Sequence, residues 1–330
     1  MMGLIQFGLR GAGIVAALFP LQPPEASSIA GDVDHLYFFL TGITVFFSVL
    51  IFSIIFYFMV KYRRRSDDEL PEDVHAPMAL ELAWTIIPSL ICVVLFVWAS
   101  SLYVRNSHPP AASTEIFVIG KQWMWHLQHP EGPREIDELH VPAGEPIKLT
   151  MTSQDVIHGF SIPAFRIKKD VLPGRYTSIW FEANEPGTYH LFCTEFCGTN
   201  HSEMIGWIYV MPRADYEAWL AGGEKSEPMA QQGEEIFNHY TCGYCHVADG
   251  SGRGPSLVGV YGKPEKLATG EMRMVDETLI RQALTDPNSV HLDGYAPIMP
   301  TFQGQFTEEQ ILQLIAYVKS LGAEERTKAK

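Results

Sequence analysis

The sequence predicts a multidomain membrane protein: a two-helix transmembrane hairpin, then a β-sandwich or β-barrel domain, then a small all-α domain. Two long charge-free segments predict the hairpin, short β-rich runs predict the second part, and helical patterns predict the third. Of the 330 residues, 47% are apolar and only 19% are charged, whereas about 25% charged residues are usual in soluble proteins. Part of the chain is therefore expected to contact lipid.

The hairpin is predicted from two apolar segments. Residues 36–60 contain no charged residue and no proline, and residues 82–104 contain no charged residue and one proline, Pro88. Each segment exceeds the roughly 20 residues that span a bilayer core. The connecting loop begins with a cluster of basic residues, and such clusters favour the cytoplasmic side. The basic loop is therefore expected in the cytoplasm, and everything after residue 105 is expected on the outer side. With its flanking residues, the hairpin is predicted to occupy residues 31–110. The cluster consists of Lys61, Arg63, Arg64 and Arg65.

The first 30 residues have the layout of a secretory signal peptide. Arg10 precedes the apolar run 11–21, and Ser28-Ile29-Ala30 offers small residues at a cleavage position. An uncleaved N-terminal segment is the alternative.

Residues 111–221 are predicted to form an antiparallel sandwich or barrel. Five β-rich runs are separated by turns rich in Pro, Gly and Asn. The runs are 115–119, 147–151, 176–181, 187–192 and 205–211.

Residues 222–330 are predicted to form a separate helical domain behind the polar linker 221–228, and we expect few contacts to cross that linker. Thr307-Glu308-Glu309-Gln310 fits a helix capping box. The residues that follow are apolar at helical spacing: Ile311, Leu312, Leu314, Ile315, Val318 and Leu321.

The most specific short motif is Cys242-Gly243-Tyr244-Cys245-His246. This C-x-x-C-H pattern attaches a c-type haem through two thioethers and supplies a histidine to the iron. A zinc pair and a redox dithiol are the alternatives. Candidates for the sixth iron ligand are Met272, Met274, His291 and Met299. Met299 is preferred because it lies in a proline-bounded loop before the last helix.

A second cluster of donor side chains lies in residues 193–204, with His158 upstream. Its donors are two thiols, two imidazoles and a thioether, which suit copper; zinc is the alternative. The candidate ligands are His158, Cys193, Cys197, His201 and Met204.

Taken together, these motifs resemble subunit II of the haem-copper cytochrome c oxidases. The resemblance covers about residues 33–322. It rests on the two transmembrane segments, Trp123-Met124-Trp125, His158-Gly-Phe-Ser-Ile-Pro163 and the Cys193–Met204 run. The helical domain resembles the class I cytochrome c that is fused to subunit II in one variant of this family.

The resemblance implies two copper ions in a dinuclear copper A centre within a cupredoxin-like domain. The thiolates of Cys193 and Cys197 would bridge the coppers, His158 and His201 would each complete one, and Met204 would bind weakly. Glu195 would contribute its backbone carbonyl, and its side chain would reach a magnesium ion shared with subunit I. On residue chemistry alone, Glu195 is equally a solvated carboxylate. One covalent haem c is implied in the last domain.

Two further positions match the family away from the metals. Glu81, in Glu81-Leu-Ala-Trp84, would stand near the entrance of a proton pathway, although an ordinary charge at a helix start is the alternative. Trp123 would receive electrons from cytochrome c, and its alternative is an edge-exposed tryptophan. Lys121 departs from the histidine of many relatives. Cys92 has no metal-type neighbours in the sequence and is expected to be a packing residue.

The expected function is electron relay on the outer face of a bacterial plasma membrane, from an external donor such as cytochrome c to subunit I, in a proton-pumping complex with other oxidase subunits. The alternatives are the corresponding subunit of a nitric oxide reductase and a membrane-anchored electron-transfer protein outside any oxidase. A formal net charge of −14 argues against nucleic acid as a partner.

Overall fold

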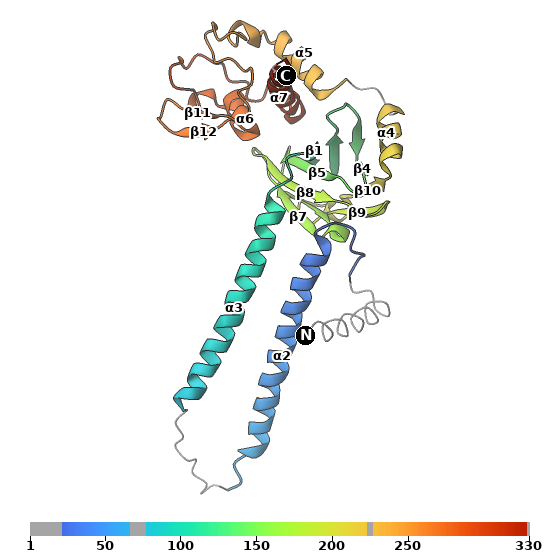
Figure 1. The fold of residues 1–330 in the computed structure, drawn as a ribbon, viewed down its shortest axis with the longest axis vertical. Coiled ribbons are helices and arrows are strands. Elements are labelled where there is room, and N and C mark those ends of the chain that lie inside the picture. Colours follow the sequence, from blue (N-terminus) through green and yellow to red (C-terminus); the bar gives the residue numbers. More distant parts are fainter. Residues whose placement is uncertain (1–21, 67–76, 223–226, 329–330) are drawn as a thin grey trace. The chain divides into compact units, whose positions relative to one another are not determined.

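The computed structural model describes residues 22–66, 77–222 and 227–328 (Figure 1). Its contacts divide the chain into two compact units. One is the hairpin, residues 28–108, and the other joins the segment before residue 28 to residues 109–330.

The hairpin unit consists of α2 (Ala30–Lys61) and α3 (Met78–Ser107). Both helices are long and apolar enough to cross a membrane, which confirms the two predicted segments. Pro88 lies inside α3. Near the loop-distal ends of the helices, Asp32 and Arg105 form an ion pair. An unpaired charge close to the apolar part of a membrane is unfavourable in free energy, which explains why these two groups are paired.

Two five-stranded sheets form the sandwich, with their shared core at fully buried side chains such as Trp125 and Phe160. The first sheet has the order β3 (Arg134–Ile136), β2 (Met124–Gln128), β1 (Thr114–Lys121), β5 (Pro146–Ser153) and β8 (Thr177–Glu182). The second has the order β4 (Glu138–Pro142), β10 (Ile205–Met211), β9 (Gly187–Cys193), β6 (His158–Ile162) and β7 (Ile167–Val171). Short 3-10 turns occupy Pro163–Phe165 and His201–Glu203.

The sandwich is confirmed, but the expectation of a purely antiparallel arrangement is wrong. β1 pairs with β5 in parallel, and β4 pairs with β10 in parallel. Between β1 and β5 the chain forms β2, β3 and β4, and a connection of that length lets the chain return in the same direction. The result is a mixed topology in both sheets.

Helix α4 (Arg213–Gly222) packs beside β4 of the sandwich. Its Tyr216 and Trp219 contact the rings of two histidines, His129 of the turn after β2 and His140 of β4. The carboxylate of Glu135 lies between the two histidines, 2.8 Å from His129 Nε2 and 2.5 Å from His140 Nδ1. This polar cluster is buried and joins α4 to the sandwich.

The last domain contains α5 (Met229–His239), α6 (Glu277–Thr285) and α7 (Glu308–Lys328), with 3-10 turns at Cys242–Tyr244 and Pro287–Ser289. The predicted capping box is confirmed, because Thr307 Oγ1 accepts from Gln310 N at 3.2 Å and Gln310 Oε1 accepts from Thr307 N at 3.0 Å. A hairpin of two three-residue strands, β11 (Pro264–Lys266) and β12 (Met272–Met274), interrupts the helices. The domain is therefore helical with one small β-hairpin.

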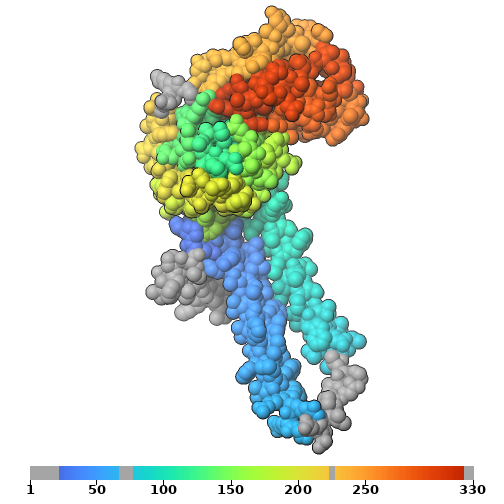
Figure 2. All heavy atoms as spheres, turned by 180° about the vertical axis from the view of Figure 1, so that it is seen from behind, coloured from blue at the N-terminus to red at the C-terminus, as the bar shows by residue number. Residues whose placement is uncertain are grey.

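The expectation that few contacts cross the linker is wrong. Phe117 of β1, Met229 of α5 and Leu312 of α7 form one buried apolar cluster. In Figure 2 the atoms of the last helix lie directly against those of the sandwich. The physical reason is that packing these apolar side chains against one another removes their surface from water.

At the N-terminal end, residues 1–21 lie outside the described residues, as does most of the expected signal peptide. Ser27 is buried, and its hydroxyl donates to the carbonyl of Phe165 at 2.9 Å. The segment just before α2 therefore packs on the sandwich.

Candidate metal and haem sites

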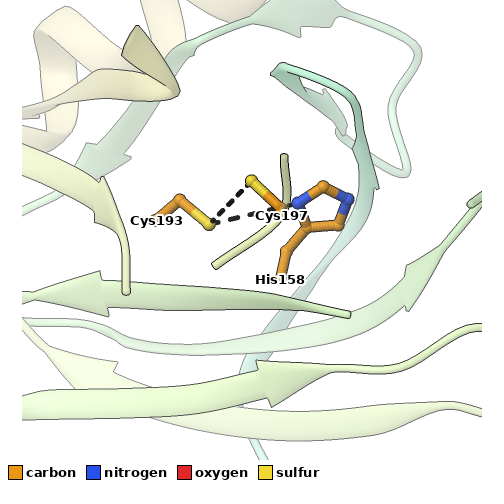
Figure 3. A group of neighbouring side chains, drawn as sticks. All are labelled: His158, Cys193 and Cys197. Atoms are coloured by element: carbon orange, nitrogen blue, oxygen red, sulfur yellow. Dashed lines mark hydrogen bonds between the residues drawn. The ribbon is translucent and has the colours of Figure 1, made fainter. Parts of the chain in front are cut away.

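The five predicted soft donors come together at one end of the sandwich. His158 begins β6, Cys193 ends β9, and the other three lie in the β9–β10 loop. The two sulfur atoms of Cys193 and Cys197 are 3.7 Å apart, and Cys193 Sγ is 4.0 Å from His158 Nδ1 (Figure 3). Cys197 Sγ is 3.4 Å from His201 Nδ1 and 3.9 Å from Met204 Sδ. The structure thus groups two thiols, two imidazoles and one thioether.

Four of the five donors are buried from solvent, and the fifth, His201, is half-buried. His158 and Met204 have no exposed surface, and Cys197 is 3% exposed. A buried set of thiols and imidazoles with a thioether beside it matches the ligand preference of copper. The residues present therefore fit the copper that the sequence suggests.

Small residues allow the ligand loops to approach one another. A Cβ atom on Gly159 would lie 2.5 Å from Thr194 Oγ1 and 2.9 Å from the backbone nitrogen of Glu195. Gly198 has φ +119°, a value that L side chains rarely adopt. Glycine at position 159 lets the loop after Cys193 lie against β6, and glycine at position 198 lets the chain pass beside Gln122 and Trp123.

The neighbours of the two thiols give them different acidities. Burial works to raise the pKa of Cys193, but hydrogen bonds from His158 and from the backbone lower it to about 6. Burial and the adjacent Cys193 raise the pKa of Cys197 to about 12. The two thiols therefore differ in acidity, and a bound metal ion would stabilise both of them as thiolates.

Asp155 is a site residue that the sequence analysis missed. Its Oδ1 is 2.9 Å from Nε2 of His158, so the imidazole is held with Nδ1 toward Cys193. Carboxylates commonly orient metal-binding histidines in this way. The only sequence signal is the spacing Asp155-x-x-His158, which is too short and common to be specific.

Trp123 contacts the donor cluster through a ligand's backbone. Its indole Nε1 donates to the carbonyl of Cys197 at 3.2 Å, and Gln122 Nε2 donates to the same oxygen at 2.7 Å. Trp123 is partly exposed. It therefore links the solvent-facing side to the buried cysteines.

Glu195 uses its backbone and side chain in different directions. Its carbonyl oxygen lies 3.3 Å from Cys193 Sγ. Its carboxylate instead forms an ion pair with Lys168 Nζ at 2.7 Å. Only the carbonyl is part of the donor cluster.

In the last domain, His246 is oriented as a haem ligand would need. Its Nδ1 is 2.8 Å from the carbonyl of Pro255, an arrangement that places the proton on Nδ1 and leaves Nε2 free for iron. Cys242 and Cys245 precede it in the chain, and His246 N donates to Cys242 O at 3.0 Å. The residues present fit a c-type haem.

The candidates for the sixth iron ligand differ in their surroundings. Met272 and Met274 lie on β12 and are 58% and 52% exposed. Met299 packs against the buried cluster of Leu284, Ile311, Leu314 and Ile315. His291 is close to the carbonyl of Asn288, at 3.4 Å from its Nδ1. Of the three candidate methionines, Met299 is the one that packs against this core, which favours it.

The remaining predicted positions lie in α3. Glu81 is in the first turn of that helix, and its side chain is exposed in the isolated chain. Cys92 is a free cysteine on the helix surface. Neither residue belongs to the donor clusters found among the described residues.

Sequence profiles of known families match three parts of the chain. Residues 16–103 match "Cytochrome C oxidase subunit II, transmembrane domain", and residues 133–210 match "Cytochrome C oxidase subunit II, periplasmic domain". Residues 230–322 match "Cytochrome c". The order of the three agrees with the order of the structural parts.

Individual relatives match most of the chain. Cytochrome c oxidase subunit 2 of Alkalihalophilus pseudofirmus is 33% identical over 293 residues, covering 83% of this chain and 82% of the relative. The protein of the same name from Bacillus sp. (strain PS3) is 28% identical over 292 residues, covering 80% of each.

A solved structure also resembles part of the chain. The periplasmic domain of subunit II of cytochrome oxidase from Bradyrhizobium japonicum is 31% identical, with a TM-score of 0.34. It covers 34% of this chain and 95% of that one.

Proposed function

Because the chain belongs to the cytochrome c oxidase subunit II family, we propose that it relays electrons from an external donor, through a haem and a copper A centre, to the oxygen-reducing subunit I. As a member of this family it is a subunit of a terminal oxidase, and it carries a cytochrome c domain. Its two helices span the plasma membrane, and the later domains face the periplasm. The grouping of five soft donors around Cys193 and Cys197 supports the relay most directly.

His158, Cys193, Cys197, His201 and Met204, with the carbonyl of Glu195, would hold two copper ions. Copper in such a site supplies one-electron redox chemistry. The chain's own contribution is rigidity: Asp155 fixes the His158 ring at 2.9 Å, and β6 and β9 fix the flanking backbone. A rigid, buried ligand set changes little between oxidation states, so electrons pass with small reorganisation.

The cytochrome c domain would receive electrons first. Cys242 and Cys245 would attach the haem, and His246 and Met299 would bind its iron. The haem supplies a second one-electron carrier. Trp123, hydrogen-bonded to the carbonyl of Cys197, is the side chain proposed to receive electrons for the copper centre.

Two carboxylates are proposed to act toward subunit I. Glu81 lies in the first turn of α3, at the end proposed to face the cytoplasm, from which protons would be taken. We assign it to the entrance of a proton pathway. The side chain of Glu195 is assigned to a magnesium ion shared with subunit I. In the structure of the chain alone, the Glu195 carboxylate forms an ion pair with the ammonium group of Lys168.

The test is an optical and EPR spectrum of the purified holo-complex with metal analysis, for the wild type and for Cys197→Ser. A serine hydroxyl is harder and far less acidic than a thiol and would not replace a thiolate ligand of copper. We expect Cys197→Ser to lose the mixed-valence copper signal and to keep the c-haem spectrum.

Cys92→Ser is the matched control, because Cys92 is a free cysteine distant in sequence from the donor loop. It is expected to keep both signals. An intact dicopper signal in Cys197→Ser would disprove the ligand assignment.

A further inference from the structure

Four charged side chains from two domains meet in a closed ring. Glu115 of β1 and Lys148 of β5 belong to the sandwich, whereas Glu277 of α6 and Lys319 of α7 belong to the cytochrome c domain. Lys319 Nζ lies 2.7 Å from both Glu115 and Glu277. Lys148 Nζ lies 2.8 Å from Glu115 and 3.5 Å from Glu277. Each lysine thus contacts both glutamates.

The charge ring, which we define as these four residues, is neutral and largely shielded from water. The four side chains are between 14% and 25% exposed. Lys319 also lies over the rings of Phe117, at 5.5 Å, and Tyr261, at 4.8 Å. Charges in such surroundings are costly unless they are balanced, and removal of one member leaves the ring with one uncompensated, partly buried charge.

Beside the charge ring lies an apolar centre. Met229 at the start of α5 has no exposed surface and packs with Phe117 of β1 and Leu312 of α7. The amide of Met229 donates to the carbonyl of Pro130 in the sandwich at 3.1 Å. This bond matters because the first amides of a helix have no partner within the helix.

Two arginines complete the rim of the contact. Arg281 of α6 donates to the carbonyl of Gly174 at 3.0 Å, and Arg134 of β3 pairs with Glu309 of α7 at 2.8 Å. An apolar centre with a polar rim is the usual anatomy of a specific protein interface. The cytochrome c domain therefore contacts the sandwich through a formed interface and not through the linker alone.

We propose that the charge ring of Glu115, Lys148, Glu277 and Lys319 locks the cytochrome c domain onto the β1–β5 part of the sandwich in one orientation. Positive and negative side chains alternate around the ring, so the ring is satisfied in only one orientation of the two domains. Any rotation that separated Lys319 from Glu115 would also separate Lys148 from Glu277. The partner for this surface is the chain's own cytochrome c domain. The proposal concerns how the domains are joined and does not depend on the metals.

The first test is zero-length cross-linking of the holo-complex with a water-soluble carbodiimide, which joins a lysine to a carboxylate in direct contact. We expect digestion and mass spectrometry to find Glu115 joined to Lys319 and Lys148 joined to Glu277. The pairs Glu115–Lys148 and Glu277–Lys319 lie within single domains and report the reactivity of the same four groups. Formation of the within-domain products alone would overturn the proposal.

The second test covers the case in which none of the four groups reacts. It measures hydrogen exchange at the Met229 amide in the holo-complex, which is expected to be slowed at least about tenfold relative to an unstructured amide. Lys319→Met is expected to remove most of that protection. Lys266→Met is the matched control, because Lys266 forms an exposed 2.8 Å pair with Asp293 inside the cytochrome c domain. An unprotected wild-type amide, or equal protection in both variants, would overturn the proposal.

Discussion

Single side chains determine how each proposed haem ligand is held. His246 is fixed by a polar contact, because its Nδ1 faces the carbonyl of Pro255 at 2.8 Å. Met299 is fixed by apolar packing against Leu284 and the α7 residues Ile311 and Ile315. A polar anchor sets ring orientation, whereas an apolar anchor sets only position, so the two ligands respond differently to substitution.

Met299→Leu is expected to leave the haem attached but to lose the low-spin His/Met iron. Leucine fills the same packing site without a thioether, and His/Met ligation raises the reduction potential. The haem is therefore expected to become harder to reduce. The measurement is the methionine-to-iron absorption near the red end of the oxidised spectrum, together with a redox titration.

The matched control is Met272→Leu, in which the absorption is expected to remain because Met272 is exposed on β12. If the band persists in Met299→Leu and disappears in Met272→Leu or Met274→Leu, the axial assignment is wrong.

The contact between helices α5 and α7 holds the cytochrome c domain together. Helices α5 and α7 cross at Gly233, where a Cβ atom would lie 2.0 Å from the carbonyl oxygen of Gln313. Backbone-to-backbone contact of this closeness is open only to glycine. The crossing holds together the first and last helices of a domain whose apolar core is small.

Gly233→Ala is expected to destabilise the cytochrome c domain by about 1–3 kcal/mol, because the added methyl group forces the helices apart. The measurement is the thermal midpoint of unfolding of that domain, monitored by the circular dichroism of the haem. Gly222→Ala is the control, since a Cβ atom there meets nothing within 4 Å. Equal midpoints for the two variants would show that the crossing is not close-packed.

Acid is expected to weaken the contact between α6 and the sandwich. Burial works to raise the pKa of Glu277, but the ammonium groups of Lys319 and Lys148 lower it from 4.5 to about 2. Tyr261 donates a hydrogen bond to the same carboxylate at 2.6 Å, and Glu115 faces it across the lysines. A carboxyl whose pKa is lowered by folding stabilises the fold above its unfolded pKa and loses that contribution as pH falls.

The expected loss is on the order of 3 kcal/mol between pH 4.5 and about 2. The measurement is the pH dependence of the thermal midpoint for the wild type and Glu277→Gln. Glutamine has no charge to lose, so its curve is expected to be flatter across this range. Parallel curves would contradict the assigned pKa.

At the scale of the whole molecule, the sequence predicts what depends on local pattern. The membrane hairpin follows from the length of its apolar segments, and α7 follows from Thr307 and Gln310 at its start. The donor residues His158 and Cys193, proposed to bind copper, are predictable because few chemistries need such residues at such spacing. The strands β1, β5, β8, β9 and β10 follow from their composition.

What the sequence does not predict depends on distant pairing. All five residues of β6 are buried, so it lacks the alternation of a half-buried strand. The sequence of neither strand predicts the parallel pairing of β1 with β5. Nor does any local pattern connect Glu115 to Lys319, which are 204 positions apart.

A docked cytochrome c domain has a kinetic consequence for the proposed electron relay. Haem-to-copper transfer is expected to be first order and nearly independent of salt between roughly 0.02 and 0.3 M, because buried ion pairs are little screened. Lys319→Met is expected to slow the transfer and to make it salt-dependent, and Lys266→Met is the control. The measurement is flash-induced reduction in the complex. A salt-dependent wild-type rate would count against a single docked state.

The charge ring also constrains how the protein can change during evolution. A substitution that reverses the charge of Glu115 leaves Lys319 facing a like charge, so selection favours a compensating change about two hundred positions away. A charge reversal at Lys148 would likewise leave Glu277 facing a like charge. Across relatives that carry both domains, the charges of the side chains at these four positions are expected to covary. Substitutions in the sandwich and in the cytochrome c domain are therefore coupled at this contact.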